Sequence, residues 1–177
     1  MPVNFFDAHH TQSEEITFGL RDDSTDKVKK PAYIKEQELD SCQGIIKNPD
    51  TIRADFYGLD DLKILKAVPN ETETESLCDG LLKHRNSLTF VELKGRAYSG
   101  WVSTATTQLI NSVRLFSANH ELNEYNTVEA FVCNSMRPHA TQNHAVQLQR
   151  FKDETRALNF KDKDMGLSMD VKREIEI

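Results

Sequence analysis

The sequence lacks an excess of positive charge. Its 177 residues carry 22 lysine and arginine side chains against 28 aspartate and glutamate side chains, which gives a net charge of −6. Proteins that coat nucleic acid or bind anionic membranes through basic surfaces have the opposite balance. The composition therefore argues against both classes of protein.

Cysteine is scarce, and long apolar runs are missing. Cys42, Cys78 and Cys133 form no Cys-x-x-Cys pair, so neither a disulfide framework nor a zinc ribbon is indicated, and we expect reduced, buried thiols. No apolar segment approaches the roughly 18 residues of a membrane span. Residues 1–10 lack the basic start and the apolar run of a secretory signal. We expect a cytoplasmic protein that does not associate with membranes.

Several catalytic motifs are also absent. The sequence contains no glycine-rich phosphate loop and no G-x-S-x-G nucleophile motif. Its six histidines do not have the spacing of zinc ligands. These absences remove nucleotide-binding, serine-hydrolase and histidine-metal sites from the leading hypotheses.

The acidic residues are concentrated at the start of the chain. Residues 1–80 have a net charge of −8, residues 81–149 have a net charge of +2, and residues 150–177 are neutral. An acidic region of this kind is typical of a surface that meets a partner. We therefore expect a homodimer or a protein partner.

Hydrophobic periodicity predicts an α/β protein with a single domain over residues 1–177. Loose helical spacing over residues 34–47 predicts a helix, and residues 62–68 fit either a strand or a short helix. The clearer elements are two strands around a turn, a long amphipathic helix, a further strand, a second helix and a final half-exposed strand. We place them at residues 75–83, 88–94, 101–120, 128–133, 140–158 and 168–177.

The two neighbouring strands carry the one concentrated chemical signal. If the turn is centred between Arg85 and Asn86, Asp79 falls directly opposite Glu92, while Lys94 points to the same face as Glu92. Two carboxylates at this separation repel each other unless a cation lies between them. Mg²⁺ (or Mn²⁺) takes oxygen ligands, so a metal bound by Asp79 and Glu92 would remove this repulsion. The same ion activates water for the hydrolysis of a phosphodiester.

The same residues resemble the PD-(D/E)XK nuclease superfamily, which has the restriction endonuclease-like fold. The resemblance rests on Asp79, on Glu92 and Lys94 at the end of an apolar strand, and on the helix that follows. It implies a three-layer sandwich in which helices flank a central mixed β-sheet. The family order of helix, three-strand meander, helix and strand would cover residues 34–134, with residues 62–68 as the first meander strand. Residues 1–33 and 135–177 would be elaborations.

The resemblance also implies roles for individual residues. Asp79 and Glu92 would bind the metal, Lys94 would be catalytic, and Gln108 of the following helix would support the site. Glu38, or Glu36, would be an additional acidic ligand from the first helix. Cys78 stands where the motif has proline, and Ser112 stands where RecB-like members have tyrosine, so that subfamily is not assigned.

Residues just beyond the motif are further candidates. Arg96, Tyr98 and Ser99 would contact substrate phosphates. Trp101 fits the core better than a base-stacking role.

The sequence thus predicts a metal-dependent nuclease that acts on DNA, with RNA as an alternative substrate. The resemblance implies a context of restriction, repair or antiviral defence. The alternative is a catalytically silent subunit of the same fold, which serves as a binding or assembly module in a larger complex.

Overall fold

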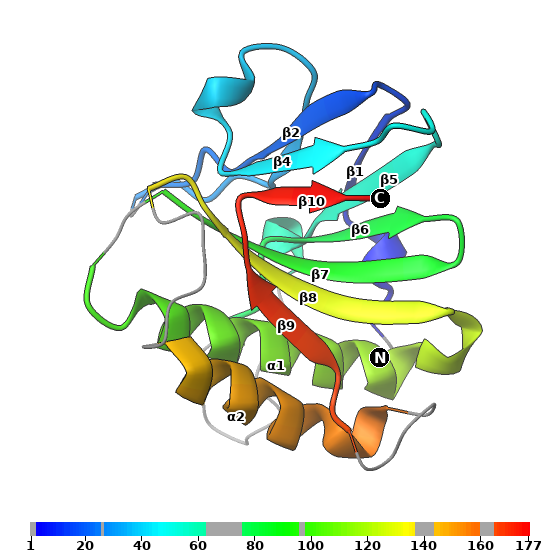
Figure 1. Ribbon diagram of the computed structural model, residues 1–177, viewed down its shortest axis with the longest axis vertical. Helices are drawn as coiled ribbons and strands as arrows, with labels where there is room; N and C mark the ends of the chain where they lie inside the picture. Colours follow the sequence, from blue (N-terminus) through cyan, green and yellow to red (C-terminus); the bar gives the residue numbers. More distant parts are fainter. Residues whose placement is uncertain (1–2, 26, 63–75, 96–97, 137–143, 160–164) are drawn as a thin grey trace.

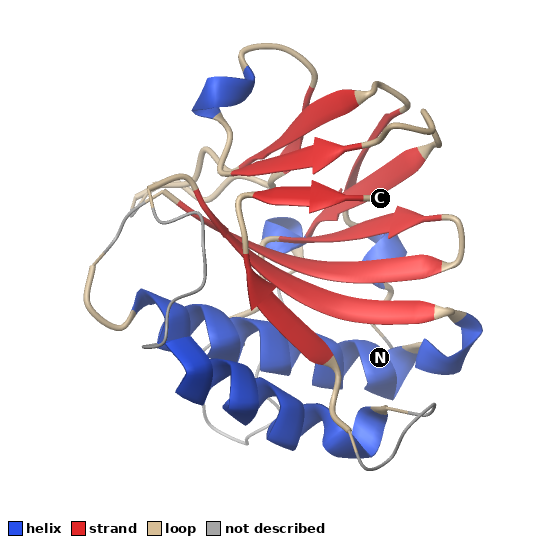
Figure 2. Cartoon of the chain, in the orientation of Figure 1, coloured by secondary structure: helices blue, strands red, loops and turns tan. Residues whose placement is uncertain are grey.

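Two mixed β-sheets and two α-helices form three layers in the computed structural model of the chain (Figures 1 and 2). The structure describes residues 3–25, 27–62, 76–95, 98–136, 144–159 and 165–177. The predicted α/β class is confirmed. Among these residues, no helix combines the length and apolar composition needed to cross a membrane.

The central layer is a six-stranded sheet with the order β1-β5-β6-β7-β8-β9. Strands β1, β5, β6 and β7 pair in antiparallel fashion, whereas β8 and β9 continue the sheet in parallel. Their bounds are His9–Ser13, Ala54–Gly58, Gly80–His84, Ser87–Lys94, Thr127–Asn134 and Ser168–Val171. The strand predicted at residues 128–133 is confirmed as β8.

The β6–β7 hairpin has the predicted register. Its two-residue turn is Arg85–Asn86, with Arg85 in the left-handed region at φ 48°, and the ladder runs from the pair His84 and Ser87 to the pair Gly80 and Val91. One further step along this ladder places Asp79 across from Glu92. The register holds because β7 is buried on both faces, and a slip by one residue would exchange the two sets of apolar side chains.

Both described helices cover one face of this sheet (Figure 1). Helix α1 spans Trp101–Asn119, as predicted, and α2 spans Ala145–Thr155. Gly100 precedes α1 at φ 80°, a conformation that suits glycine. The apolar face of α1 packs on β7 and β8 and makes the larger core, in which Phe90 and Phe116 are fully buried.

The opposite face is covered by a second sheet rather than by helices. This sheet has the order β10-β4-β2-β3, with bounds Glu174–Glu176, Gly44–Lys47, Thr17–Arg21 and Tyr33–Lys35. Phe18 and Ile46 of this sheet meet Phe56, Leu82 and Val91 of the central sheet in a second buried core. Among the described residues, helices cover only one face of the central sheet, so the expectation of helices on both faces is wrong.

The helix predicted at residues 34–47 is also wrong. This segment forms β3, the short 3-10 turn η2 (Leu39–Ser41) and β4. Strand β4 pairs with β2 on one side and with β10 on the other, so partners distant in the sequence override the loose helical spacing.

Two other elements differ from the predictions. The first meander strand is β5, because β6 pairs with β5 and β7; apart from Leu62, residues 62–68 lie outside the described residues. The final segment forms two strands in different sheets, β9 and β10. The second helix is confirmed over α2 and the following turn η6 (Arg156–Leu158), whereas residues 140–143 lie outside the described residues.

Candidate active site

A pocket of about 270 Å³ lies at the ends of β6 and β7 that are remote from their turn. Its wall combines the residues before β6, the end of β7, α1, the turn η3 (Leu59–Asp61) and the loop between β2 and β3. The polar residues around it are Asp22, Lys29, Asp60, Ser76, Asp79, Lys94 and Gln108. Three of the residues predicted from the sequence, Asp79, Lys94 and Gln108, therefore border one cavity.

Glu92 lies behind this wall and is fully buried. Its Oε1 forms an ion pair with Lys94 Nζ, while its Oε2 has no hydrogen-bond partner among the described residues. Asp79 is 9% exposed, and its Oδ2 accepts a hydrogen bond of 2.5 Å from the Leu93 backbone N–H. The Asp79 carboxyl group is thus bound to the backbone of Leu93, the residue that follows Glu92 in β7.

Lys94 is held between Glu92 and the helix. Its Nζ donates to Gln108 Oε1 at 3.2 Å, and Gln108 Nε2 donates to the Leu77 carbonyl at 3.0 Å. The Gln108 amide therefore ties the ammonium group to the segment that leads into Asp79. This contact places the predicted Gln108 in the site rather than on the helix surface.

Burial dominates the electrostatics of this cluster. Desolvation, followed by the charge of Glu92, raises the pKa of Asp79 well above its usual value. Desolvation also raises the pKa of Glu92, to about 7, although Lys94 opposes the shift. For Lys94, burial lowers the pKa, but the charges of Glu92 and Asp79 outweigh burial and the net pKa is raised. Burial therefore disfavours the charged forms of both carboxyl groups, and Lys94 offsets this only in part.

A hard cation fits this set of donors. The Oε2 of Glu92 is buried without a geometrically sound hydrogen bond in the described part of the chain, and burial raises the pKa of both carboxyl groups, so a cation between them would favour their charged forms. Within the described residues, no three His, Cys, Asp or Glu side chains are grouped so as to hold a metal. A cation at Asp79 and Glu92 would therefore take its remaining ligands from water and substrate, as Mg²⁺ commonly does.

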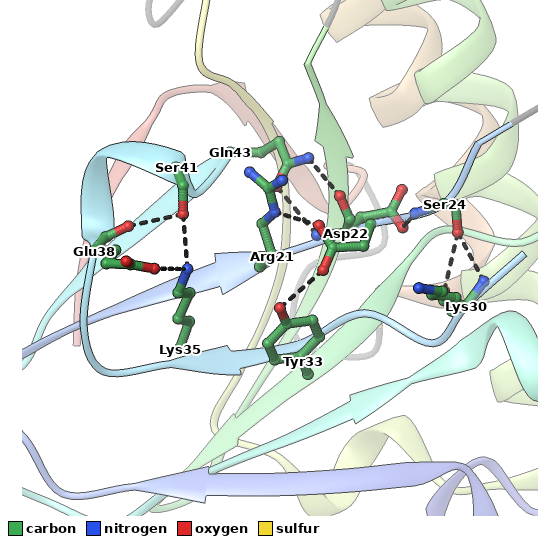
Figure 3. Close-up of polar contacts among 10 residues, drawn as sticks. Arg21, Asp22, Ser24, Lys30, Tyr33, Lys35, Glu38, Ser41 and Gln43 are labelled. Atoms are coloured by element: carbon green, nitrogen blue, oxygen red, sulfur yellow. Dashed lines mark hydrogen bonds and ion pairs between the residues drawn. The ribbon is translucent and has the colours of Figure 1, made fainter.

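The other predicted residues do not join the pocket. Glu38 pairs with Lys35 at 2.6 Å in an exposed turn of the second sheet, and Glu36 accepts a hydrogen bond from Ser13 (Figure 3 shows Glu38). The structure does not bring Glu38 to the described pocket lining, because the helix that was expected to carry it is not formed.

The loop beyond the motif contributes fewer residues to the described pocket lining than predicted. Tyr98 is exposed yet close enough to raise the pKa of Lys94, and Ser99 is exposed; neither belongs to the described pocket lining. Arg96 lies outside the described residues. Trp101 is 6% exposed and packs against His144, which confirms its place in the core.

Sequence reasoning missed three charged residues of the pocket, namely Asp22, Lys29 and Asp60. The charge of Asp22 contributes to the raised pKa of Asp79, and that of Asp60 contributes to the raised pKa of Glu92. The only signal of Asp22 and Asp60 in the sequence was the acidic excess of residues 1–80, part of which therefore surrounds the pocket, whereas nothing in the sequence pointed to Lys29. The three cysteines are free and buried, as predicted.

Ser112 anchors the site to α1. Its Oγ accepts a hydrogen bond of 2.7 Å from the Cys78 backbone N–H and donates to the Gln108 carbonyl at 2.8 Å. A hydroxyl group at this position thus fixes the residue that precedes Asp79.

Replacing Ser112 by alanine should destabilise the protein by about 1–3 kcal/mol, because the buried N–H of Cys78 loses its acceptor. Urea denaturation measures the change. Ser117→Ala is the matched control, since Ser117 Oγ also donates to a carbonyl of α1, but in a hydrogen bond that is exposed to solvent. Equal losses of stability in the two variants would show that the contact with Cys78 contributes nothing.

Comparisons with known proteins give no match, since no family model, no curated protein and no solved structure is significantly similar to this chain.

Proposed function

We propose that the protein is a divalent-metal-dependent nuclease that hydrolyses phosphodiester bonds, with DNA as the preferred substrate. The observation that carries the proposal is the buried cluster of Asp79, Glu92 and Lys94 beside a pocket at the ends of β6 and β7. Desolvating two carboxylates beside one ammonium group costs free energy, and such a cluster is more typical of a functional site than of a structural ion pair.

Each residue has a chemical task in this proposal. Asp79 and Glu92 would hold Mg²⁺ or Mn²⁺, which would supply Lewis-acid stabilisation of the phosphate and lower the pKa of water. Lys94 orients the attacking water and offsets the negative charge that develops on the phosphate oxygens. Gln108 keeps the Lys94 ammonium group in place through its contact at 3.2 Å.

The order of elements supports the family resemblance at the level of topology. The meander β5-β6-β7 is followed by α1 and then by β8, which lies parallel to β7. We propose a restriction endonuclease-like core on this basis, in which a second sheet takes the place of the first helix. Action within restriction, repair or antiviral defence, as a homodimer or with a protein partner, is part of the same proposal.

The test is cleavage by the purified protein. Linear, circular and single-stranded DNA and RNA are incubated with Mg²⁺, Mn²⁺ or EDTA, and products are resolved on denaturing gels. We expect cleavage that requires metal and stops in EDTA. If no substrate is cut with either metal, the catalytic proposal is wrong. Metal-independent binding of nucleic acid without cleavage would then favour the silent binding module.

A further inference from the structure

The loop between β2 and β3, residues 22–32, brings a second charged segment to the pocket. Asp22 and Lys29 of this loop border the same cavity as Asp79 and Lys94, although Lys29 precedes Asp79 by 50 positions in the sequence. No motif of the sequence points to this loop. Its role follows from where the fold places it.

The start of the loop is fixed in place. The Asp22 backbone N–H donates to Gln43 Oε1 at 3.1 Å, and Gln43 Nε2 returns a hydrogen bond of 2.8 Å to the Asp22 carbonyl. Arg21 and Tyr33 both hold the Asp23 carboxylate, at 2.7 and 2.9 Å. Figure 3 shows Asp22 between Gln43 and Ser24, beside the end of β2. The loop therefore leaves β2 in one defined direction.

Hydrogen bonds within the loop hold the part that carries Lys29. Ser24 Oγ lies 3.0 Å from both the backbone N–H and the carbonyl of Lys30 (Figure 3), and the Thr25 N–H donates to the Val28 carbonyl at 2.8 Å. Beyond Lys30, the buried Ala32 packs so tightly on β5 that a Cβ on Gly58 would lie 2.2 Å from its carbonyl oxygen. These contacts fix the backbone on both sides of Lys29.

The charged residues around the pocket show which cation is free to bind an anion. Among the described residues, the pocket lining holds three acidic residues, Asp22, Asp60 and Asp79, against two lysines, Lys29 and Lys94, and the buried Glu92 lies behind it. Lys94 has a side chain only 18% exposed and is already paired with Glu92 and Gln108. Lys29 is exposed and takes part in no ion pair within the described part of the chain. It is therefore the cation at this pocket that remains available to an incoming anion.

We propose that Lys29 binds a backbone phosphate of the nucleic-acid substrate at the mouth of the pocket. The inference rests on the proposed nuclease function and adds to it a substrate-binding residue outside the Asp79, Glu92 and Lys94 motif. A phosphodiester that approaches this acidic pocket is repelled by its carboxylates, and a lysine at the mouth offsets that repulsion. Because a phosphate contact does not read the bases, Lys29 contributes affinity without sequence preference.

The experiment measures binding separately from cleavage. A short fluorescein-labelled DNA duplex is titrated with the full-length protein in Ca²⁺, with anisotropy recorded at several NaCl concentrations and intact DNA verified on a gel. Lys29→Ala should weaken binding about tenfold and lower the slope of log K against log salt by about one. Lys29→Arg, which keeps the charge, should restore most of the affinity. Lys27→Ala is the matched control, because Lys27 is an exposed lysine of the same loop outside the pocket lining.

The outcomes separate this inference from the proposed function. If the parent protein cuts DNA and Lys29→Ala binds like Lys27→Ala, the role of Lys29 is wrong and the nuclease proposal stands. If the parent never cuts DNA but Lys29→Ala alone loses affinity and salt dependence, Lys29 binds phosphate and the nuclease proposal fails. Absence of DNA binding by the parent protein would overturn the inference about Lys29.

Discussion

Replacing Glu92 by glutamine should lower the rate of metal-dependent DNA cleavage by about 10³-fold. Glutamine keeps the shape of the side chain but removes the charge that would hold the metal on the buried side of the pocket. Initial rates on labelled linear DNA in saturating Mn²⁺ measure the effect. A rate within a few-fold of the parent would remove Glu92 from the site.

The matched control for this variant is Glu129→Gln. Glu129 is a partly buried carboxylate of β8 in the same sheet, outside the described pocket lining, and burial raises its pKa as well. It should keep the parental rate. Loss of cleavage in both variants would point to damage of the sheet rather than to the chemistry of the pocket.

Replacing Lys94 by methionine should destabilise the metal-free protein by about 3–5 kcal/mol, because the variant leaves the fully buried Glu92 without its counter-charge. Urea denaturation in EDTA measures the loss. The double variant Glu92→Gln/Lys94→Met removes both charges and should regain most of the lost stability. If the double variant is as unstable as Lys94→Met, the stem of Lys94 contributes packing, and the buried ion pair is not the cause.

The β6–β7 hairpin was predictable because its information is local. A two-residue turn at Arg85–Asn86 and apolar residues on both faces fix the register, and the register alone places Asp79 opposite Glu92. Helix α1 was predictable for a similar reason, since its buried residues repeat with helical spacing over five turns. The core of the candidate site is built from these two local units.

The second sheet was not predictable from local patterns. Strand β4 is held by β2, which precedes it by more than 20 residues, and by β10 at the other end of the chain. The same long-range pairing carries the β2–β3 loop to the pocket, and with it Asp22 and Lys29. Without knowledge of these partners, residues 21–31 are recognisable only as a charged, turn-rich stretch.

Direct titration with Mn²⁺ tests the central claim, which is that Asp79 and Glu92 share one divalent cation. Isothermal calorimetry on the metal-free protein should give saturable binding of about one ion per chain, with protons released because the pKa values of both carboxyl groups are raised in the metal-free state. The double variant Asp79→Asn/Glu92→Gln should show no such binding. Undiminished binding by the double variant, or no binding by the parent protein, would contradict the assignment.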